Sequence, residues 1–267
     1  MDADRRRDLA RRAALAGGAV ALESFREDID VLTKDGKTDV VTQADRDAQS
    51  TVVAVIKDEF PDDLIVGEEA DARKRVPETG AAWVIDPIDG TNNYVRGMRE
   101  WGTSVAAVVD GEPVAAATAL PALGDTYAAG PNEVTRNGDS IAVSDRTDPE
   151  LCAVSPTIWW GYDRRGEYGT IATEIVERFA DLRRVGCAQA SLAMVADGAL
   201  DGVVTNVDPN PWDSIAGAHL VRRAGGTVTG LDGDPWRFDS VGLVASNGRI
   251  HDELLQVAKA ADAARRE

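Results

Sequence analysis

The sequence predicts a layered α+β fold, ordered helix, sheet, helix, sheet, helix. Three observations predict it: two helical patterns open the chain, short apolar runs broken by Gly, Pro and Asp fill its middle, and strand-like and helix-like segments alternate in its second half. The apolar fraction of 43% is that of an ordinary globular protein, and 267 residues are enough for one large core. We expect a single unit over 1–267, with halves of about 1–143 and 144–267 and no hinge between them.

The first helix is expected from about residue 4 to residue 26, where apolar residues recur with helical spacing. Its expected core positions are Leu9, Leu15, Val20, Leu22 and Phe25. The internal pair Gly17-Gly18 weakens this pattern. The following "KDGKTDVV" is expected to be irregular or a hairpin, and "TQADRDAQSTVVAVIKDEF" a second helix, with Thr42 as its N-cap and Pro61 beyond its end.

The middle of the chain is expected to form a mostly antiparallel sheet. Its apolar runs are "LIVG", "AAWVI", "TSVAAVVDG", "PVAAATAL" and "DTYAAG". Within "VAAVVDGEPVAAAT" an Asp-Gly pair separates two strand-like segments, which is a strong hairpin signal.

The second half is expected to alternate between strands and helices. The strands are "CAVSP", "ADLRRVG", "LDGVVT", "GTVTG" and "GLVASN". The helices are "EYGTIATEIVERFA", "CAQASLAMVADG", "DSIAGAHLVRRAGG" and "RIHDELLQVAKAADAARR". Two of these helices close on glycine, the usual residue after a helix C-terminus.

The charge balance limits the partners. Forty-six acidic against 29 basic residues give a net charge of −17, which would repel a nucleic-acid backbone. A cation-binding function could account for a handful of the carboxylates. Because the acids are dispersed along the chain, adaptation of the surface to high salt explains most of them better.

The chain carries no signal for a membrane or an oxidising compartment. No apolar run approaches the roughly 18 residues of a membrane span, and the N-terminus is too charged for a secretory signal. Cys152 and Cys187 form neither a close-spaced metal pair nor a disulfide framework. We therefore expect a cytoplasmic protein.

Acidic residues at four places are candidates for a site: Asp45, Glu68-Glu69, the pair Asp86 and Asp89, and Asp213. Taken alone, Asp45 fits a solvent-exposed acid on a helix, and Glu68-Glu69 fits a loop. Asp213 opens a helix, where an acid is favoured by the helix dipole and by capping alone.

The pair Asp86 and Asp89 in "AAWVIDPIDGTNN" is less easily explained by a turn. An apolar strand delivers both carboxylates at its end, and two fixed carboxylates repel unless a cation lies between them. Oxygen ligands without Cys or His select a hard ion such as Mg²⁺ or Mn²⁺. The following "GTNN" offers backbone N–H groups for a phosphate. The residues alone leave a plain turn and a metal–phosphate site equally open.

The combination of motifs along the chain favours the metal–phosphate site over a plain turn. "KDGKTDVVTQAD", "GEE", "DPIDGTNN", "TRNGDSIAVSD", "RRVGCAQASLAMVADGALD" and "WDSIAGA" occur in this order along nearly the whole chain. Together they resemble the inositol monophosphatase family, within the Mg²⁺-dependent, lithium-sensitive phosphatases that include fructose-1,6-bisphosphatases. The resemblance implies the layered sandwich of the sugar phosphatases, with a metal- and phosphate-binding first half and a substrate-binding second half. It also implies a homodimer and two to three Mg²⁺ per site, with Mn²⁺ as an alternative.

The resemblance also implies roles for single residues. Glu68, Asp86 and the carbonyl of Ile88 would hold the first ion, and Asp86, Asp89 and Asp213 the second. A third ion would lie near Glu68 and Lys34. Asp45 and Thr91, with Glu68, would be the catalytic residues that activate water. The implied contacts to phosphate or substrate are Asp89, Gly90, Thr91, Gly186, Cys187, Ala188 and Asp213.

Several positions depart from the family pattern or stay open. The family's sugar-contacting acid would fall at Thr205 or Asn206, with Asp208 as a possible substitute in "VVTNVDPNPWD", which puts specificity for inositol in doubt. Cys187 stands where a small Ser or Thr is common, and we interpret it as a packing residue. Trp159, Trp160 and Tyr162 are expected to pack in the core or an interface. Neither His219 nor His251 is given a catalytic role.

The expected function is hydrolysis of a small sugar or polyol phosphate, inositol 1-phosphate and/or fructose 1,6-bisphosphate, by metal-activated water. One alternative is a 3′-phosphoadenosine 5′-phosphate phosphatase, disfavoured because the chain lacks the longer insertions of those relatives. The other is a non-catalytic regulatory member, disfavoured by the charge and by the complete set of metal ligands.

Overall fold

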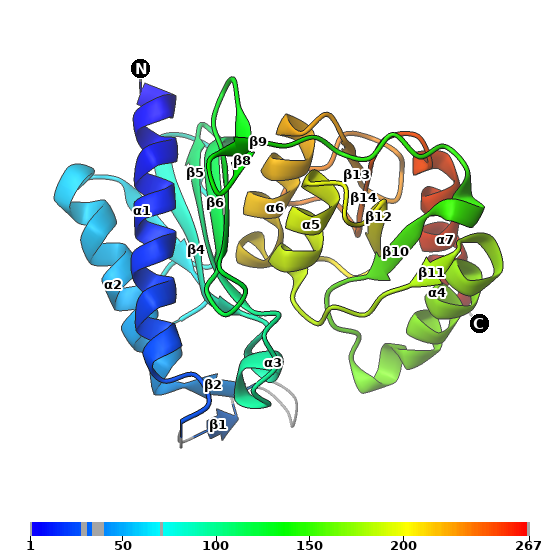
Figure 1. Cartoon of the computed structure of the whole chain (residues 1–267), viewed down its shortest axis with the longest axis horizontal. Coiled ribbons are helices and arrows are strands. Elements are labelled where there is room, and N and C mark those ends of the chain that lie inside the picture. The colour runs from blue at the N-terminus through cyan, green and yellow to red at the C-terminus, as the bar shows by residue number, and fades with distance from the viewer. Residues whose placement is uncertain (1, 28–30, 34–39, 70–71, 266–267) are drawn as a thin grey trace.

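The computed structural model describes residues 2–27, 31–33, 40–69 and 72–265. Its elements stack in five layers, seen edge-on in Figure 1: a helix pair, a seven-stranded sheet, a second helix pair, a five-stranded sheet and a third helix pair. This confirms the predicted layered α+β fold. The proposed division into halves near residue 143 remains a prediction.

The first layer is formed by α1 (Asp2–Glu23) and α2 (Gln43–Glu59). Leu9 is buried as predicted, but Leu15 and Leu22 are exposed, so their assignment to the core was wrong. The buried face of α1 is lined instead by small residues: Ala10, Ala13, Ala14, Gly17, Gly18 and Ala21. A Cβ atom on Gly17 would lie 2.5 Å from Cγ2 of Val52 in α2. The two helices are thus packed too closely for large side chains.

A short antiparallel hairpin, β1 (Val31–Thr33) and β2 (Val40–Thr42), leads into α2. The predicted hairpin reading of "KDGKTDVV" agrees with these two strands, although residues 34–39, including Lys34, lie outside the described residues. α2 starts directly after Thr42, as its capping signal predicts.

The seven-stranded sheet has the order β3-β4-β5-β6-β7-β8-β9. Its strands are β3 (Leu64–Gly67), β4 (Ala81–Asp89), β5 (Gly102–Val109), β6 (Glu112–Leu120), β7 (Asp125–Ala129), β8 (Val134–Arg136) and β9 (Asp139–Ser140). Among these described strands only β3 and β4 pair in parallel, which confirms the mostly antiparallel prediction. The predicted hairpin turn is Asp110-Gly111, where both residues have positive φ.

The second sheet has the order β11-β10-β12-β14-β13. Its strands are β10 (Ala153–Pro156), β11 (Asp181–Leu182), β12 (Gly202–Thr205), β13 (Thr227–Thr229) and β14 (Leu243–Ser246). The outer helices are α4 (Arg165–Arg178) and α7 (His251–Ala264), and the short elements are α3 (Thr91–Val95), η1 (Pro149–Leu151) and η2 (Tyr162–Arg164). The predicted strand in "ADLRRVG" is reduced to the two residues of β11.

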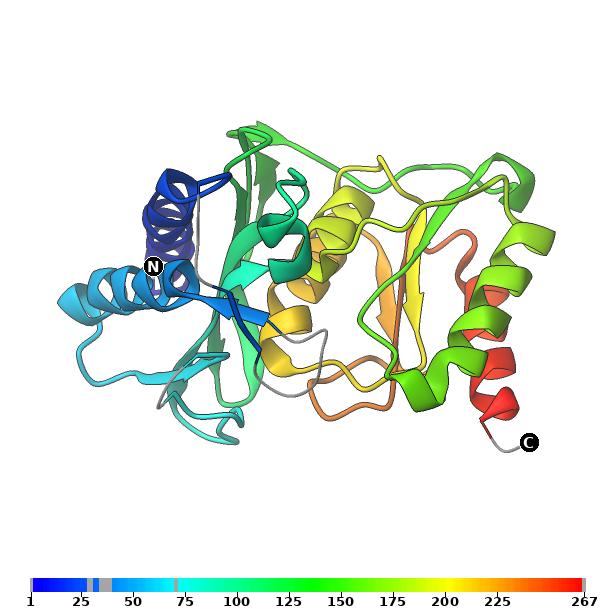
Figure 2. The same cartoon turned by 90° about the horizontal axis from the view of Figure 1, so that it is seen from below.

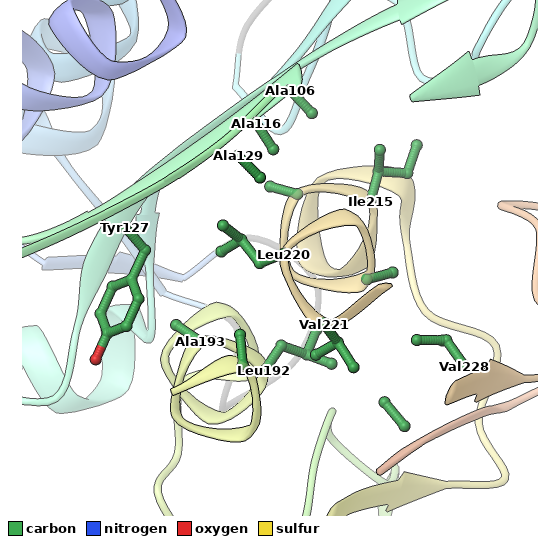
Figure 3. Packing of buried hydrophobic residues seen from close by; sticks show 14 of the residues in the cluster. Ala106, Ala116, Tyr127, Ala129, Leu192, Ala193, Ile215, Leu220, Val221 and Val228 are labelled. Carbon is green, nitrogen blue, oxygen red and sulfur yellow. The ribbon is translucent and has the colours of Figure 1, made fainter. Parts of the chain in front are cut away.

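Helices α5 (Ala188–Ala196) and α6 (Pro211–Arg223) fill the layer between the two sheets. Figure 3 shows Ile215 and Leu220 of α6 facing Ala106, Ala116 and Ala129 of the large sheet, while Val221 turns toward the small one. Alanines on the sheet let α6 approach closely, so one apolar cluster joins both halves. The first turn of α5 bonds Asp89 at the end of β4, and Asp213 in the first turn of α6 lies close to the same carboxylate.

Candidate metal and phosphate site

The site begins where the two parallel strands end. In the register of β3 and β4, Gly67 lies beside Ile85, so the next residues, Glu68 and Asp86, come level at the same edge of the sheet. Carboxyl ends of neighbouring parallel strands are where α/β folds commonly place ligands. Two acids 18 positions apart in sequence are therefore neighbours for a topological reason.

A β-bulge explains how Asp86 and Asp89 can act together. Successive side chains of a regular strand alternate between faces, so residues three apart would point in opposite directions. Here Asp86 pairs with Ser104 but Asp89 pairs with Gly102, which leaves one extra residue on β4. This extra residue reverses the alternation and turns both carboxylates to the same side. Pro87, which has no N–H to offer, suits the bulge.

Three carboxylates from two elements form a cluster. Oxygens of Asp86 and Asp89 on β4 and Asp213 in the first turn of α6 all lie within 4.8 Å of one another. Asp86 and Asp89 are buried and Asp213 is half-buried. Pro211 starts α6, and Asn210 donates from Nδ2 to the Asp213 carboxylate at 2.9 Å. Sequence position alone attributed Asp213 to capping; the fold brings it to the β4 pair.

The electrostatics of this cluster are unfavourable without a cation. Burial raises the pKa of Asp86 well above its usual range, and the negative charges of Glu68, Asp89, Asp213 and Asp45 raise it further. Burial followed by the charges of Asp89 and Glu68 raises the pKa of Asp213 to about 8. Glu68, Asp89, Asp213 and Asp45 thus all lie within electrostatic reach of Asp86.

Asp89 is held by the start of α5. Its Oδ2 accepts from the Cys187 thiol at 2.9 Å and from the Gln189 backbone N–H at 2.5 Å. Burial raises the pKa of Asp89, whereas these hydrogen bonds, a further one from the Ala188 N–H and the charge of Arg184 lower it. Cys187 is buried, and burial raises the pKa of its thiol. The interpretation of Cys187 as packing alone is therefore incomplete, because its thiol bonds Asp89.

Gly90 and Thr91 continue directly from the cluster. Gly90 has φ 84°, and a Cβ there would lie 3.0 Å from Cβ of Cys187, so only glycine fits the approach to α5. The Thr91 hydroxyl donates to the Ile88 carbonyl at 3.0 Å. Seen from below in Figure 2, the α3 helix that Thr91 opens lies beside the α5–α6 layer.

Asp45 in the first turn of α2 is buried, which corrects its interpretation as a solvent-exposed acid. A single helix pattern could not reveal this, because the site side of α2 is covered by another element. The negative charge of Asp45 raises the pKa of both Asp86 and Tyr94, which places it beside the cluster.

The loop that carries Glu68 is fixed through its backbone. The carboxamide of Gln49 in α2 donates to the Glu69 carbonyl at 2.9 Å and accepts from the Glu69 N–H at 3.0 Å. Lys74 Nζ donates to the Glu68 carbonyl at 2.7 Å. Glu69 itself is buried, whereas Glu68 is half-buried. Gln49 and Lys74 could not be singled out from the sequence, since neither belongs to an acidic motif.

The candidates for a sugar contact differ in their surroundings. Thr205 and Asn206 are buried, and the Asn206 carboxamide is engaged by Trp160 Nε1 at 2.8 Å and by Glu167. Asp208 is exposed and accepts from the Gly242 N–H at 3.1 Å. Of the neighbouring aromatics, Trp160 is buried while Trp159 and Tyr162 are exposed. Core packing is confirmed for Trp160 only.

The family follows from a comparison over the whole chain. A profile of the inositol monophosphatase family matches residues 2–263. The chain belongs to the inositol monophosphatase family. This confirms the resemblance drawn from the motifs.

Individual relatives agree with this family. The chain is 35% identical over 263 residues to a protein of Aquifex aeolicus named fructose-1,6-bisphosphatase/inositol-1-monophosphatase, covering 94% of each. It is 34% identical over 258 residues to a histidinol-phosphatase of Streptomyces coelicolor, covering 92% of the chain and 94% of the relative. The solved structure of a Thermotoga maritima IMPase superposes with a TM-score of 0.88 at 33% identity, covering 99% of the chain and 100% of that structure.

Membership supports a phosphatase hydrolase, and the family depends on metal ions. The residues present fit a metal ion on structural grounds. Oδ1 of Asp86 is buried and has no hydrogen-bond partner among the described residues, in a side chain that lies within reach of two other carboxylates. Such an atom is costly unless a cation satisfies it. Within the described part of the chain, no helix is long and apolar enough to cross a membrane.

Proposed function

We propose that the protein is a Mg²⁺-dependent phosphomonoesterase that hydrolyses a small sugar or polyol phosphate. The observation that carries this proposal is the buried cluster of Asp86, Asp89 and Asp213, followed at once by the Gly90-Thr91 turn. Acids alone would suit any cation site. A glycine turn beside them leaves backbone N–H groups where a phosphate bridging to the cations would lie.

The proposed ligands divide between ions. One ion would take Glu68, Asp86 and the Ile88 carbonyl, a second would take Asp86, Asp89 and Asp213, and a third, weaker one would lie near Glu68 and Lys34. The oxygen-only donor set favours Mg²⁺, with Mn²⁺ as a substitute. Level placement of Glu68 and Asp86 at the sheet edge supports the first set, and the 4.8 Å cluster supports the second.

Bound ions of this kind lower the pKa of a water molecule and neutralise charge on the phosphate and on the leaving oxygen. The residues of the chain supply the positions. Thr91, fixed by its hydrogen bond to the Ile88 carbonyl, orients the attacking water, and Asp45 accepts its proton. A water–phosphorus bond forms as the ester bond breaks in line with it. The alcohol and inorganic phosphate leave without a covalent enzyme intermediate.

The alcohol half of the substrate would meet the start of α5 and the end of β12. Gly186, Cys187 and Ala188 would offer the contacts that the family pattern implies. Because the Asn206 side chain is engaged by Trp160 and Glu167, we infer that it shapes the rim and that the sugar contact falls to its neighbours. This arrangement suits a permissive sugar or polyol site better than one built for inositol alone.

Purified protein should release phosphate from inositol 1-phosphate or fructose 1,6-bisphosphate with Mg²⁺, and lose that activity on treatment with EDTA. The panel should include 3′-phosphoadenosine 5′-phosphate and histidinol phosphate, the latter because of the Streptomyces coelicolor relative. Released phosphate is measured with each substrate. Preference for either added substrate would replace our substrate assignment. No release from any of them, with metal still bound, would favour the regulatory alternative.

The net charge of −17 leads us to propose adaptation to a salt-rich cytoplasm. Like charges on the surface repel at low ionic strength and are screened at molar salt. The same panel, run at 0.1 and at about 3 M KCl with a thermal melt at each, tests this. A midpoint that falls with salt would contradict it. A homodimer, which the resemblance alone suggests, is checked by sedimentation in the same buffers.

A further inference from the structure

We propose that Gln189 is a positioning residue that holds Asp89 and Asp213 at the separation needed to bind one divalent cation. This inference rests on the proposed function and extends it to a residue of α5 that contacts neither ion nor substrate. Gln189 is fully buried, and its backbone N–H and both polar atoms of its side chain form hydrogen bonds with the cluster's two supporting elements, β4 and α6.

The backbone N–H of Gln189 forms a hydrogen bond with the last residue of β4. Its N–H belongs to the first turn of α5, where helix N–H groups have no partner inside the helix. It donates to Oδ2 of Asp89 at 2.5 Å. This bond, together with the one from Cys187, fixes one oxygen of Asp89. The carboxylate can therefore present only its remaining lone pairs to an ion.

The side chain of Gln189 forms two hydrogen bonds with the backbone of α6. Nε2 donates to the Trp212 carbonyl at 2.6 Å, and Oε1 accepts from the Gly217 N–H at 2.7 Å. The orientation of the amide is unambiguous, because a carbonyl can only accept and a backbone N–H can only donate. In a regular helix the Gly217 N–H is offered to the carbonyl of Asp213 itself. The carboxamide thus hydrogen-bonds the backbone of α6 at two points, immediately before Asp213 and one turn after it.

The absence of a side chain at Gly217 makes these two hydrogen bonds possible. A Cβ atom at that position would lie 2.9 Å from Oε1 of Gln189 and 2.4 Å from Cβ of Leu192. Only glycine lets α5 and α6 come this close. A single residue consequently ties Asp89 to Asp213, although these ligands come from different elements and are 124 positions apart in the chain.

The Gln189→Leu variant tests the inference, since leucine fills a similar volume and keeps the backbone N–H but loses both side-chain hydrogen bonds. Gln189→Met, with a longer and more flexible side chain, is the second variant. Thr229→Val is the control, because it removes a different buried hydrogen bond, to His251, far from the cluster. Metal-free full-length protein is titrated with Mn²⁺, and free Mn²⁺ is read by electron paramagnetic resonance.

We expect one class of Mn²⁺ sites to weaken about 10- to 100-fold in both Gln189 variants, the range typical for partners that orient metal ligands, and to stay unchanged in Thr229→Val. The rise in melting temperature on adding Mn²⁺ should shrink in parallel. A purely structural role would lower the melting temperature equally with and without Mn²⁺. Folded Gln189 variants that keep every dissociation constant within twofold would overturn the inference.

A measurement on the unaltered protein covers the case in which neither variant folds. With ¹⁵N-labelled glutamine, the side-chain NH₂ of Gln189 should exchange with solvent far more slowly than those of exposed Gln43 and Gln256. If the Gln189 side chain exchanged as fast as those of Gln43 and Gln256, its proposed hydrogen bonds to α6 would be refuted. A wild-type protein that binds no Mn²⁺ overturns the inference as well. Binding without phosphate release contradicts only the proposed function, and the titration still decides on Gln189.

Discussion

Asp86→Asn is expected to lower turnover at least about 10³-fold and to stabilise the metal-free protein at the same time. Asp86 is a proposed ligand of the first and the second ion, so its loss removes several kcal/mol of transition-state stabilisation, and about 4 kcal/mol corresponds to 10³-fold. Without metal, however, Asp86 is a buried carboxylate with an unpaired Oδ1 beside other acids. Asparagine keeps its shape and removes a charge that burial disfavours.

The measurement is phosphate release with saturating Mg²⁺, combined with urea unfolding in EDTA at neutral pH. Asp201→Asn is the matched control. Asp201 is equally buried, but Ser144, Arg146 and the Ala153 N–H bind its carboxylate. This control should lose stability, by about 1.5–3 kcal/mol for weakened charge-assisted bonds, and keep its turnover. An Asp86→Asn protein with full turnover would refute the site.

The metal-free protein is expected to lose stability as the pH rises from about 7.2 to 8. Burial and neighbouring charges raise the pKa of Asp86 and Asp213, the latter to about 8, above the value near 3.8 expected for unfolded chains. Between these values the folded protein retains protons that the unfolded chain has released. Stability then falls with pH, by up to about 1.4 kcal/mol per pH unit for each retained proton.

Below this pH range the two histidines have the opposite effect, because their titration increases the stability of the folded protein as the pH rises. Burial lowers the pKa of His219 to about 4 and lowers that of His251, so both favour folding as the pH rises through 6.5, the value for an unfolded histidine, and most of this effect is complete by about pH 7.2. Urea unfolding in EDTA at about pH 7.2, 7.6 and 8 gives the slope of the free energy of unfolding against pH. Saturating Mg²⁺ should abolish the decline, because it binds the ionised carboxylates. A metal-free protein that gains stability across this window would contradict the raised pKa values.

The order of helices and strands could be predicted because it depends on local chemistry. The Asp110-Gly111 turn, the Thr42 start of α2 and the glycines after α5 and α6 each act within a few residues. The acids Asp86 and Asp89 could also be singled out, since a strand delivers both. Their roles as metal ligands, together with those of Glu68 and Ile88, and the role of Thr91 in orienting water remain predictions that the geometry supports.

Other features were not accessible to sequence patterns. The buried face of α1 was mispredicted because hydrophobic spacing favours leucines, whereas close packing on α2 selects Gly17 and its small neighbours. Gln189 gave one weak signal, a lone long polar residue in an otherwise small and apolar helix. Nothing in its local sequence indicates that its partners would be Asp89, Trp212 and Gly217.

The sequence by itself thus determined the elements, their layered order and the family. The family resemblance also implied that Asp213 joins the β4 pair, and the tertiary structure brings these residues together. Only the tertiary structure decided that Asp45 is buried and that Asn206 is engaged by Trp160. The physical reason is the distance along the chain over which each effect acts. Hydrophobic periodicity and turn chemistry depend on residues only a few positions apart. Contacts between residues far apart in the sequence depend on how closely helices and sheets can approach, which the small residues at their interfaces set.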